Sequence, residues 1–230
     1  MNDRSSSGRA AVAHRASAEG RLVAGPTPRR RSPRRRLALA LAVLLVIAGA
    51  LGTWYQVHQA MPAWYARLWY PLEHEDLIRA EAARQDLDPA LVAAVINTES
   101  GFVADSRSSQ GAVGLMQLLP ETAEFVAREP RRPSPPPDRL EDPAVNIAYG
   151  TRYLRYLVDR YGTVPLALAA YNGGETNLTQ WLERARSQGE SLDIPHDIPF
   201  TETRGFVSRV LDAVPIYRRA YGDRLGVDGR

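Results

Sequence analysis

The feature that most constrains the fold of this chain is an uncharged apolar run from Leu37 to Tyr55. Nineteen helical residues at about 1.5 Å each come close to the ~30 Å hydrocarbon core of a bilayer. Six arginines lie within residues 29–36, just before the run, and the next basic residue after it is Arg67. The positive-inside rule therefore predicts a transmembrane helix over residues 37–55, with its N-terminal side in the cytoplasm and the C-terminal domain outside.

Two other interpretations of this run compete with an uncleaved signal anchor. Small residues at Ala48-Gly49-Ala50 would suit the cleavage site of a signal peptide. We favour the anchor because both the apolar run and the tail before it are long for a signal peptide. A buried core helix is disfavoured by the arginine cluster beside the run. Aromatic residues of the types found at the outer interface of a bilayer follow at Trp54, Tyr55, Trp64 and Tyr65.

The charge of the chain is concentrated in its N-terminal part. Residues 1–36 hold ten arginines against Asp3 and Glu19, so this part carries +8 and the remainder −5. The part is rich in Ser, Arg, Ala and Pro without apolar periodicity, which predicts a disordered cytoplasmic tail over residues 1–36. A basic run can bind nucleic acid, but its place before an apolar helix explains it more simply. We therefore expect no nucleic-acid partner.

Apolar stripes at helical spacing follow residue 71, and no stretch alternates long enough to predict a strand. The predicted fold is an all-α globular domain, with little or no sheet, behind one N-terminal transmembrane helix. Residues 56–71 are expected to form a short amphipathic connector, residues 72–222 the domain, and residues 223–230 a C-terminal tail. The expected helices cover Glu73–Gln85, Pro89–Ser100, Glu121–Glu129, Pro143–Tyr161, Pro165–Tyr171, the region of Leu178–Ala185, and Thr203–Tyr221.

Local signals support these helices and one loop. Asp88-Pro89 and Asp142-Pro143 each combine an N-cap residue with proline at the first helical position. The run Pro130–Pro137 must interrupt helix and predicts a surface loop. Recognition of this run by a polyproline-binding partner is the alternative.

Glu99 lies at an unusual place for a carboxylate. It follows Val95 by four residues and Ile96 by three, which puts it on the apolar face of its predicted helix. It also lies in the last turn, where the helix dipole disfavours negative charge. Desolvation and the dipole both predict a raised pKa, and a glutamate protonated near neutral pH suits a general acid. The alternative at this point is a frayed helix end with Glu99 in water.

The residues around Glu99 belong to a series of five motifs. They are Glu99-Ser100-Gly101-Phe102, Gly111–Gln117 (GAVGLMQ), Asn146–Leu154 (NIAYGTRYL), Ala170–Gly174 (AYNGG) and Ile198–Arg204 (IPFTETR). In this order they resemble the motifs of the lytic transglycosylases of the soluble, lysozyme-like type. The resemblance covers nearly the whole external domain. One departure is Gly173, where a residue with a side chain is usual.

The resemblance implies a peptidoglycan substrate, cut between N-acetylmuramic acid and N-acetylglucosamine. Glu99 would act as the single acid and base, and the product would carry a 1,6-anhydro ring without consumption of water. The other site residues that it implies are Ser108, Met116, Gln117, Tyr171 and Glu202.

Each of these residues has an implied role. Ser108 and Gln117 would hydrogen-bond the substrate near the cleavage point. Tyr171 would lie against a sugar ring and hold Glu99 in place, and Glu202 would bind substrate or tune Glu99. Met116 would pack beneath Glu99 or the sugar. Plain core packing is the alternative for Met116, and an acid stabilised at a helix N-terminus is the alternative for Glu202.

No metal and no cofactor are expected. The chain has no cysteine, and its four histidines are scattered, without the second histidine that a zinc-binding helix needs. The expected partners are peptidoglycan glycan strands and the lipid membrane through residues 37–55, and no particular protein partner is indicated. The expected location is the bacterial cytoplasmic membrane, crossed once, with the domain on the periplasmic or cell-wall side.

Three other functions compete with a transglycosylase. A lysozyme-type hydrolase on the same fold would use water and usually a second acid. A non-catalytic wall-binding scaffold could keep the fold, although intact Glu99, Gln117 and Tyr171 argue against it. A membrane-anchored DNA binder would use the arginine tail.

Overall fold

The computed structural model describes residues 33–128 and 139–227. In these ranges every regular element is a helix, which confirms the predicted all-α fold. The predicted tail lies outside the described residues up to residue 32, as do residues 130–137 of the predicted proline-rich loop. The chain divides into two compact units, Met1–Leu51 and Gly52–Arg230, and each is described by itself.

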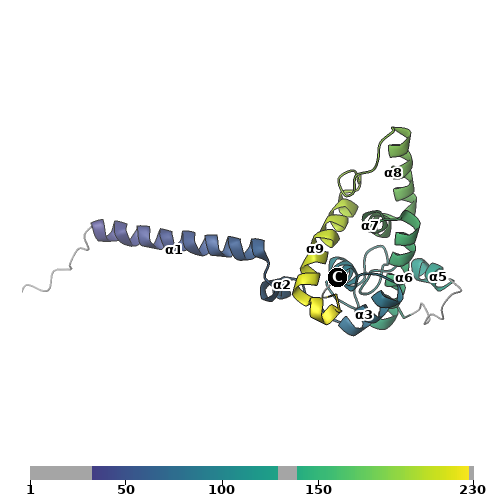
Figure 1. Cartoon of the computed structure of the whole chain (residues 1–230), viewed down its shortest axis with the longest axis horizontal. Coiled ribbons are helices and arrows are strands. Elements are labelled where there is room, and N and C mark those ends of the chain that lie inside the picture. Colours follow the sequence, from purple (N-terminus) through teal and green to yellow (C-terminus); the bar gives the residue numbers. More distant parts are fainter. Residues whose placement is uncertain (1–32, 129–138, 228–230) are drawn as a thin grey trace, which may run out of the picture. The chain divides into compact units, whose positions relative to one another are not determined.

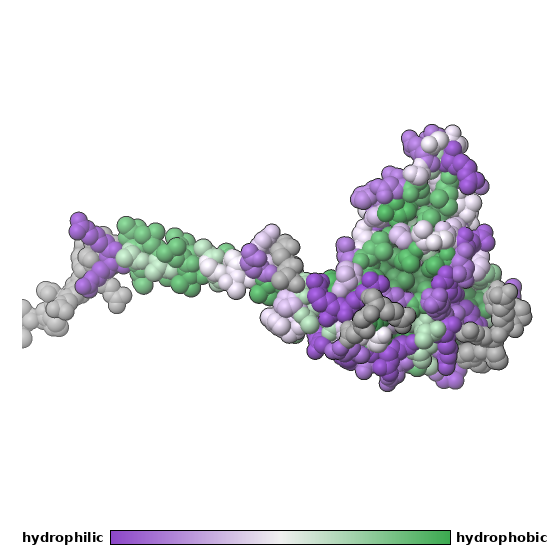
Figure 2. All heavy atoms as spheres, viewed as in Figure 1, coloured by the Kyte–Doolittle hydropathy of each residue, from purple (hydrophilic) through white to green (hydrophobic). Residues whose placement is uncertain are grey.

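Helix α1 (Pro33–Ala60) contains the predicted residues 37–55 and extends beyond them at both ends. Arginine has good helix propensity, so the basic residues before the apolar run continue the helix instead of ending it. Its segment Arg34–Val57 is long and apolar enough to cross a membrane, judged by length and composition. Figure 2 shows hydrophobic residues along most of α1 and hydrophilic residues at its N-terminal end.

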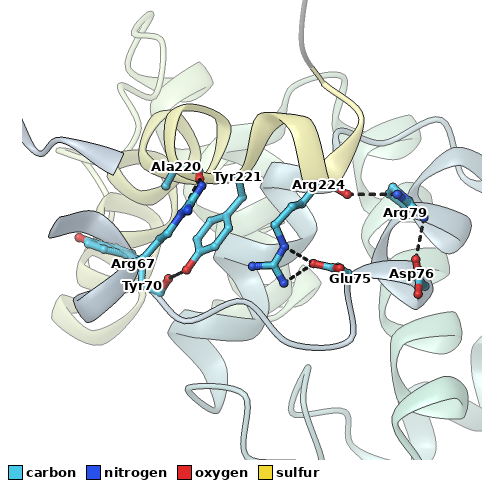
Figure 3. A network of polar contacts seen from close by, with 8 residues as sticks. All are labelled: Arg67, Tyr70, Glu75, Asp76, Arg79, Ala220, Tyr221 and Arg224. Atoms are coloured by element: carbon cyan, nitrogen blue, oxygen red, sulfur yellow. Dashed lines mark hydrogen bonds and ion pairs between the residues drawn. The ribbon is translucent and has the colours of Figure 1, made fainter. Parts of the chain in front are cut away.

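The segment expected to be a short amphipathic connector, residues 56–71, contains a second helix, α2 (Ala63–Trp69). Ala66 is buried in the main core, and α2 packs against α9 (Thr201–Leu225). The Arg67 guanidinium donates two hydrogen bonds, of 3.0 and 2.8 Å, to the Ala220 carbonyl oxygen (Figure 3). Helix α2 is therefore a packed part of the second unit.

Helix α4 (Pro89–Glu99) forms the centre of the core. The Asp88 carboxylate accepts a hydrogen bond of 2.8 Å from the Ala90 amide and starts the helix as predicted. All residues from Ala90 to Ile96 are buried, so α4 is apolar on every side before its last turn. It packs along α9, whose buried apolar residues belong to the same core.

The other helices build around this pair. They are α3 (Glu75–Arg84), α5 (Pro120–Ala127), α6 (Pro143–Tyr161), α7 (Val164–Gly173) and α8 (Glu175–Ser187). Helix α7 packs against α6, α8 and α9, and Figure 1 shows it between the two long helices α6 and α9. Helix α6 ends at Gly162, whose φ of +79° lies in the left-handed region that glycine adopts at helix ends.

Several helix boundaries differ from those predicted, most of them by one or two residues. Helix α9 begins at Thr201 and continues to Leu225, so residues 223–225 of the expected C-terminal tail are helical, and Leu225 is buried. Helix α5 ends at Ala127, two residues earlier than expected. Between α4 and α5 the chain forms no helix, and a loop over residues 100–119 holds two isolated bridges, from Val113 to Arg107 and to Leu118.

Candidate active site

The carboxylate of Glu99 lies at the wall of a groove of about 980 Å³ in the second unit. The groove is lined by the end of α4, the loop over residues 100–119, the end of α7 and the start of α9. Its lining includes four of the residues implied by the resemblance besides Glu99, namely Ser108, Gln117, Tyr171 and Glu202. Segments far apart in the sequence are thus brought to one site.

The carboxyl group of Glu99 is held in an environment that disfavours its charge. Burial raises its pKa to about 8, and the negative charge of Glu202 adds to the rise. The positive charge of Arg209 acts in the opposite direction and is outweighed by burial. Because α4 is apolar up to Ile96, the last turn of the helix carries Glu99 from the core directly to the groove. At neutral pH the folded chain therefore keeps a proton on Glu99.

Ser100 and Asn146 fix the loop that follows Glu99. The Ser100 hydroxyl donates a hydrogen bond of 2.8 Å to the Leu115 carbonyl, which ties the loop to the end of α4. Asn146, buried on α6, accepts from the Met116 amide at 2.7 Å and donates to the carbonyls of Val113 and Leu140 at 2.9 and 2.8 Å. One buried side chain thus bonds three backbone groups, two in this loop and one just before α6.

Gly114 is required where the loop passes Asn146. Its φ is +82°, and a Cβ added there would lie 2.2 Å from the Asn146 amide nitrogen and 2.4 Å from the Leu140 carbonyl oxygen. Both the backbone conformation and the close approach exclude a side chain. The resemblance motif Gly111–Gln117 therefore has a local physical reason at this position.

Tyr171 joins α7 to the same loop. Its hydroxyl donates a hydrogen bond of 2.7 Å to the Met116 carbonyl oxygen, and its ring stacks on Phe206 with centroids 6.4 Å apart. Burial and the nearby charge of Glu99 raise the pKa of Tyr171 well above its ordinary value, so the hydroxyl stays protonated. Tyr171 lines the groove together with Glu99, and its hydroxyl is bonded to the loop that forms the wall beside it; its expected role of holding Glu99 in place stays a prediction.

Met116 is the one implied site residue that the groove does not include. Its side chain is fully buried and packs against Gly150 of α6, where an added Cβ would lie 2.3 Å from the Met116 sulfur. A buried thioether makes no contact with a ligand in the groove. Met116 thus packs on the core side of the loop, as in the alternative of plain core packing, and a role beneath Glu99 or the sugar stays a prediction.

Ser108 and Gln117 present polar groups to the groove. The Ser108 oxygen accepts hydrogen bonds from the Gln110 and Ala112 amides at 3.2 and 3.0 Å, which leaves its proton to donate to a ligand. The side-chain amide nitrogen of Gln117, Nε2, donates hydrogen bonds to the carbonyls of Ser106 and Gly114 at 3.1 and 2.8 Å. Gln117 has a φ of +47°, a costly conformation for a residue with a side chain. This strain at a groove residue suits a positioned functional group.

Arg209 is a groove residue that the sequence interpretation missed. It follows Glu202 by seven residues and Phe206 by three, so all three lie on one face of α9 and line the groove. The periodicity assigned this face to the core through Phe206, and the charged residue one turn later was overlooked. Glu202 and Arg209 thus put one acidic and one basic group within electrostatic range of Glu99.

The departure at Gly173 also has a structural reason. A Cβ added there would lie 3.1 Å from both the Thr203 methyl group and the Trp181 ring. The absence of a side chain therefore lets the end of α7 approach α8 and the start of α9 closely. Elsewhere in the groove Thr98, Thr122 and Asn172 add polar groups to the lining. Among the described residues no group of three or more His, Asp or Glu side chains could hold a metal ion.

The sequence of this chain is similar to a known domain family and to several known proteins. Residues 76–194 match the family model described as the transglycosylase SLT domain. The soluble lytic murein transglycosylase of Escherichia coli K12 is 32% identical over 157 residues, which cover 67% of this chain and 24% of that protein. The membrane-bound lytic murein transglycosylase C of Yersinia enterocolitica is 30% identical over 164 residues, with 62% of this chain and 46% of that protein covered.

A solved structure shows the same likeness in three dimensions. It is the inactive glutamate-to-glutamine mutant of the lytic transglycosylase Slt from Pseudomonas aeruginosa, with a TM-score of 0.61 and 33% sequence identity. The match covers 75% of this chain and 28% of that chain. This chain thus spans about a quarter of the length of the soluble relatives that it matches.

Replacement of Gly114 by alanine should destabilise the fold far more than the same change at Gly111. Both glycines have positive φ, of +82° and +86°, but an added Cβ meets nothing within 4 Å at Gly111. Gly111→Ala should cost about 1 kcal/mol of unfolding free energy, from backbone strain alone. Gly114→Ala should cost a further ~1–3 kcal/mol from the clash. Denaturant melts of both variants compare the two, and equal losses would contradict this account of the loop.

Glu99→Gln should stabilise the chain increasingly as the pH rises. The pKa of Glu99 is raised in the folded state from about 4.5 to about 8, so between these values the folded chain binds a proton that the unfolded chain has released. The contribution of protonated Glu99 to the free energy of unfolding is present in full below pH 4.5 and is lost as the pH rises through 8. Urea melts of wild type and Glu99→Gln at pH 5, 6.5 and 8 measure the effect. A stability difference that does not change with pH would contradict the raised pKa.

Proposed function

Since the chain belongs to the transglycosylase SLT domain family, we propose that it is a peptidoglycan lytic transglycosylase with Glu99 as its acid and base. The observation that carries the proposal is a half-buried carboxyl group, with a pKa raised to about 8, in the wall of a groove. An acid protonated at neutral pH can donate to a glycosidic oxygen. The groove is an open one, which suits a polymeric substrate.

The proposed reaction uses one proton twice. Glu99 donates it to the bridging oxygen between N-acetylmuramic acid and N-acetylglucosamine, and the glycosidic bond breaks. The muramyl centre then carries oxocarbenium-like charge, which the N-acetyl group of the substrate stabilises. The C6 hydroxyl of the same sugar attacks that centre while its proton passes to the Glu99 carboxylate. The new ring is the 1,6-anhydro product, and no water is consumed.

The groove residues have separate tasks in this proposal. Ser108 and Gln117 hydrogen-bond the sugars beside Glu99, because their polar groups face the groove from a loop held by Ser100 and Asn146. Arg209 lowers the pKa of Glu99 and Glu202 raises it, and both offer charged groups to the polar substrate. Tyr171 and Met116 keep the loop in place from below.

The relatives support the same reaction. The two relatives described above are named as lytic murein transglycosylases, and one solved neighbour is a glutamate-to-glutamine mutant described as inactive. A role for one glutamate in that protein agrees with a role for Glu99, which lies in the groove wall here. The part of this chain that matches the family, residues 76–194, holds Glu99, Gln117 and Tyr171 of the groove.

We also place the domain on the outer side of the bacterial cytoplasmic membrane, anchored through α1. The segment Arg34–Val57 has the length and composition of a membrane span, and arginines lie at its N-terminal end. Murein lies on the outer side of that membrane, and two relatives of this chain are named as membrane-bound. The orientation follows from the positive-inside rule.

A hydrolase on the same fold is the second candidate, and Glu202 is the observation that favours testing it. This second carboxylate lines the same groove and lies close enough for its charge to raise the pKa of Glu99. Glycosidases that use water need two carboxyl groups at the cleaved bond. The two reactions differ in their product, so one digestion separates them.

Digestion of purified peptidoglycan by the full chain in detergent should release fragments with 1,6-anhydro ends. Mass spectrometry distinguishes these ends from reducing ends, which are heavier by one water. Glu99→Gln should lower the rate by at least about 1000-fold, because the variant has no proton to donate. Glu183→Gln, an equivalent change on the exposed side of α8, is the matched control and should keep the wild-type rate.

Reducing ends from the wild type would assign the hydrolase instead. Equal product from wild type and Glu99→Gln would show that the reaction does not use this carboxyl group and would overturn the proposal.

A further inference from the structure

Helix α2 presents a hydrophobic face to its surroundings. Trp64, Leu68 and Trp69 are 62%, 71% and 64% exposed, which is unusual for large apolar side chains. Tyr65 lies between the two tryptophans, with its ring centroid 5.6 Å from Trp64 and 6.4 Å from Trp69. These four residues are called the α2 aromatic face below.

The α2 aromatic face lies opposite the side by which α2 packs. At about 100° per residue, Trp64, Leu68, Tyr65 and Trp69 follow one another around roughly 140° of the helix. Ala66 and Arg67 occupy the opposite side, where Ala66 is buried and Arg67 bonds to α9. The outward side therefore consists only of aromatic and aliphatic residues, and Arg67 is the one charged residue in α2.

Hydrogen bonds hold helix α2 and the two residues after it against α9. Besides the two hydrogen bonds from Arg67 to Ala220, the Tyr221 hydroxyl donates to the Tyr70 carbonyl at 2.8 Å. The Tyr217 hydroxyl donates to the Pro71 carbonyl at 2.7 Å. Figure 3 shows Arg67 and Tyr221 side by side beneath the ribbon of α9. The guanidinium carbon of Arg67 lies 5.4 Å from the centre of the Tyr221 ring. Because these contacts use the polar groups around α2, the aromatic face is held outward.

The chain itself indicates what covers this face. The apolar span of α1 ends at Val57, and α2 begins at Ala63. Six residue steps cannot reach further than about 20 Å. A chain that crosses the bilayer with α1 must therefore keep α2 near the lipid headgroups, where tryptophan and tyrosine are enriched.

We propose that α2 lies in the outer interface of the membrane, with its aromatic face inserted among the headgroups and upper acyl chains. This inference rests on the proposed membrane anchoring. It adds a second contact with the membrane, through α2, to the contact that the span makes. A helix of this kind buries its apolar face about 5–10 Å into the boundary region. The bilayer would cover the side chains that the domain leaves exposed.

The consequence is a limit on where the groove can act. Glu202 and Ala220 are both on α9, 18 residues apart, and a helix of this length spans about 27 Å. With α2 in the interface, the groove cannot lie further than roughly 30 Å from the helix that touches lipid. The enzyme would then cut glycan strands close to the membrane and not those in the outer layers of the wall.

Lipid quenching of tryptophan fluorescence tests this arrangement. The full chain is placed in nanodiscs at one copy per disc, with phosphatidylethanolamine, phosphatidylglycerol and a lipid carrying a doxyl quencher near the headgroup. Three variants each keep Trp181, which is buried in the core, together with one of Trp54, Trp64 or Trp69, and the other two positions become phenylalanine. A variant with Trp181 alone gives the background.

The inference predicts that Trp64 and Trp69 lose at least half of their emission to the quencher, as Trp54 at the end of the span also should. Quenching of Trp54 without quenching of Trp64 and Trp69 would overturn the inference and leave the anchor intact. No quenching at any of the three would reject the anchor itself. Emission of Trp64 and Trp69 that shifts to the blue only in discs with two copies would assign the face to a second copy of the chain and overturn the lipid assignment.

Discussion

The desolvation of one carboxyl group at the end of an apolar helix is the constraint on which the site depends. Helix α4 is buried from Ala90 to Ile96, so only its last turn, from Asn97 to Glu99, carries polar side chains. Glu99 leaves this core at the groove, and burial there raises its pKa to about 8. A carboxylate in such a place costs stability at neutral and higher pH, which is the pattern of a residue retained for chemistry instead of for folding.

The loop after Glu99 is the second part of the site, and its contacts explain why the motifs have their residues. Gly114 leaves room for Asn146, Gly150 leaves room for Met116, and the hydrogen bonds of Asn146 replace those of a regular element. Tyr171 closes the loop on the α7 side through the Met116 carbonyl. The groove wall thus has a fixed shape although it contains no strand in the described residues, and polar groups on it can be positioned for a substrate.

Local patterns in the sequence predicted the helices and Glu99, because their causes are local. The Asp-Pro pairs start α4 and α6 as expected, and the spacing from Val95 and Ile96 put Glu99 on an apolar face. What the sequence missed depends on contacts between distant segments. Arg209 enters the groove only because α9 packs along α4, and α2 is a packed helix because Arg67 meets Ala220, 153 residues away. Burial of Met116 depends on α6 in the same way.

The protonation of Glu99 at neutral pH is the central claim, and a titration by carbon-13 NMR tests it most directly. Chain labelled at the glutamate side-chain carboxyl carbon gives one signal that is absent from Glu99→Gln, and its shift is followed from pH 3 to pH 10. The account predicts a midpoint near 8, which Glu202→Gln should lower and Arg209→Gln should raise, because the charges of these two groups act on Glu99 in opposite directions. A midpoint near 4.5, the ordinary value of a glutamate, would contradict it.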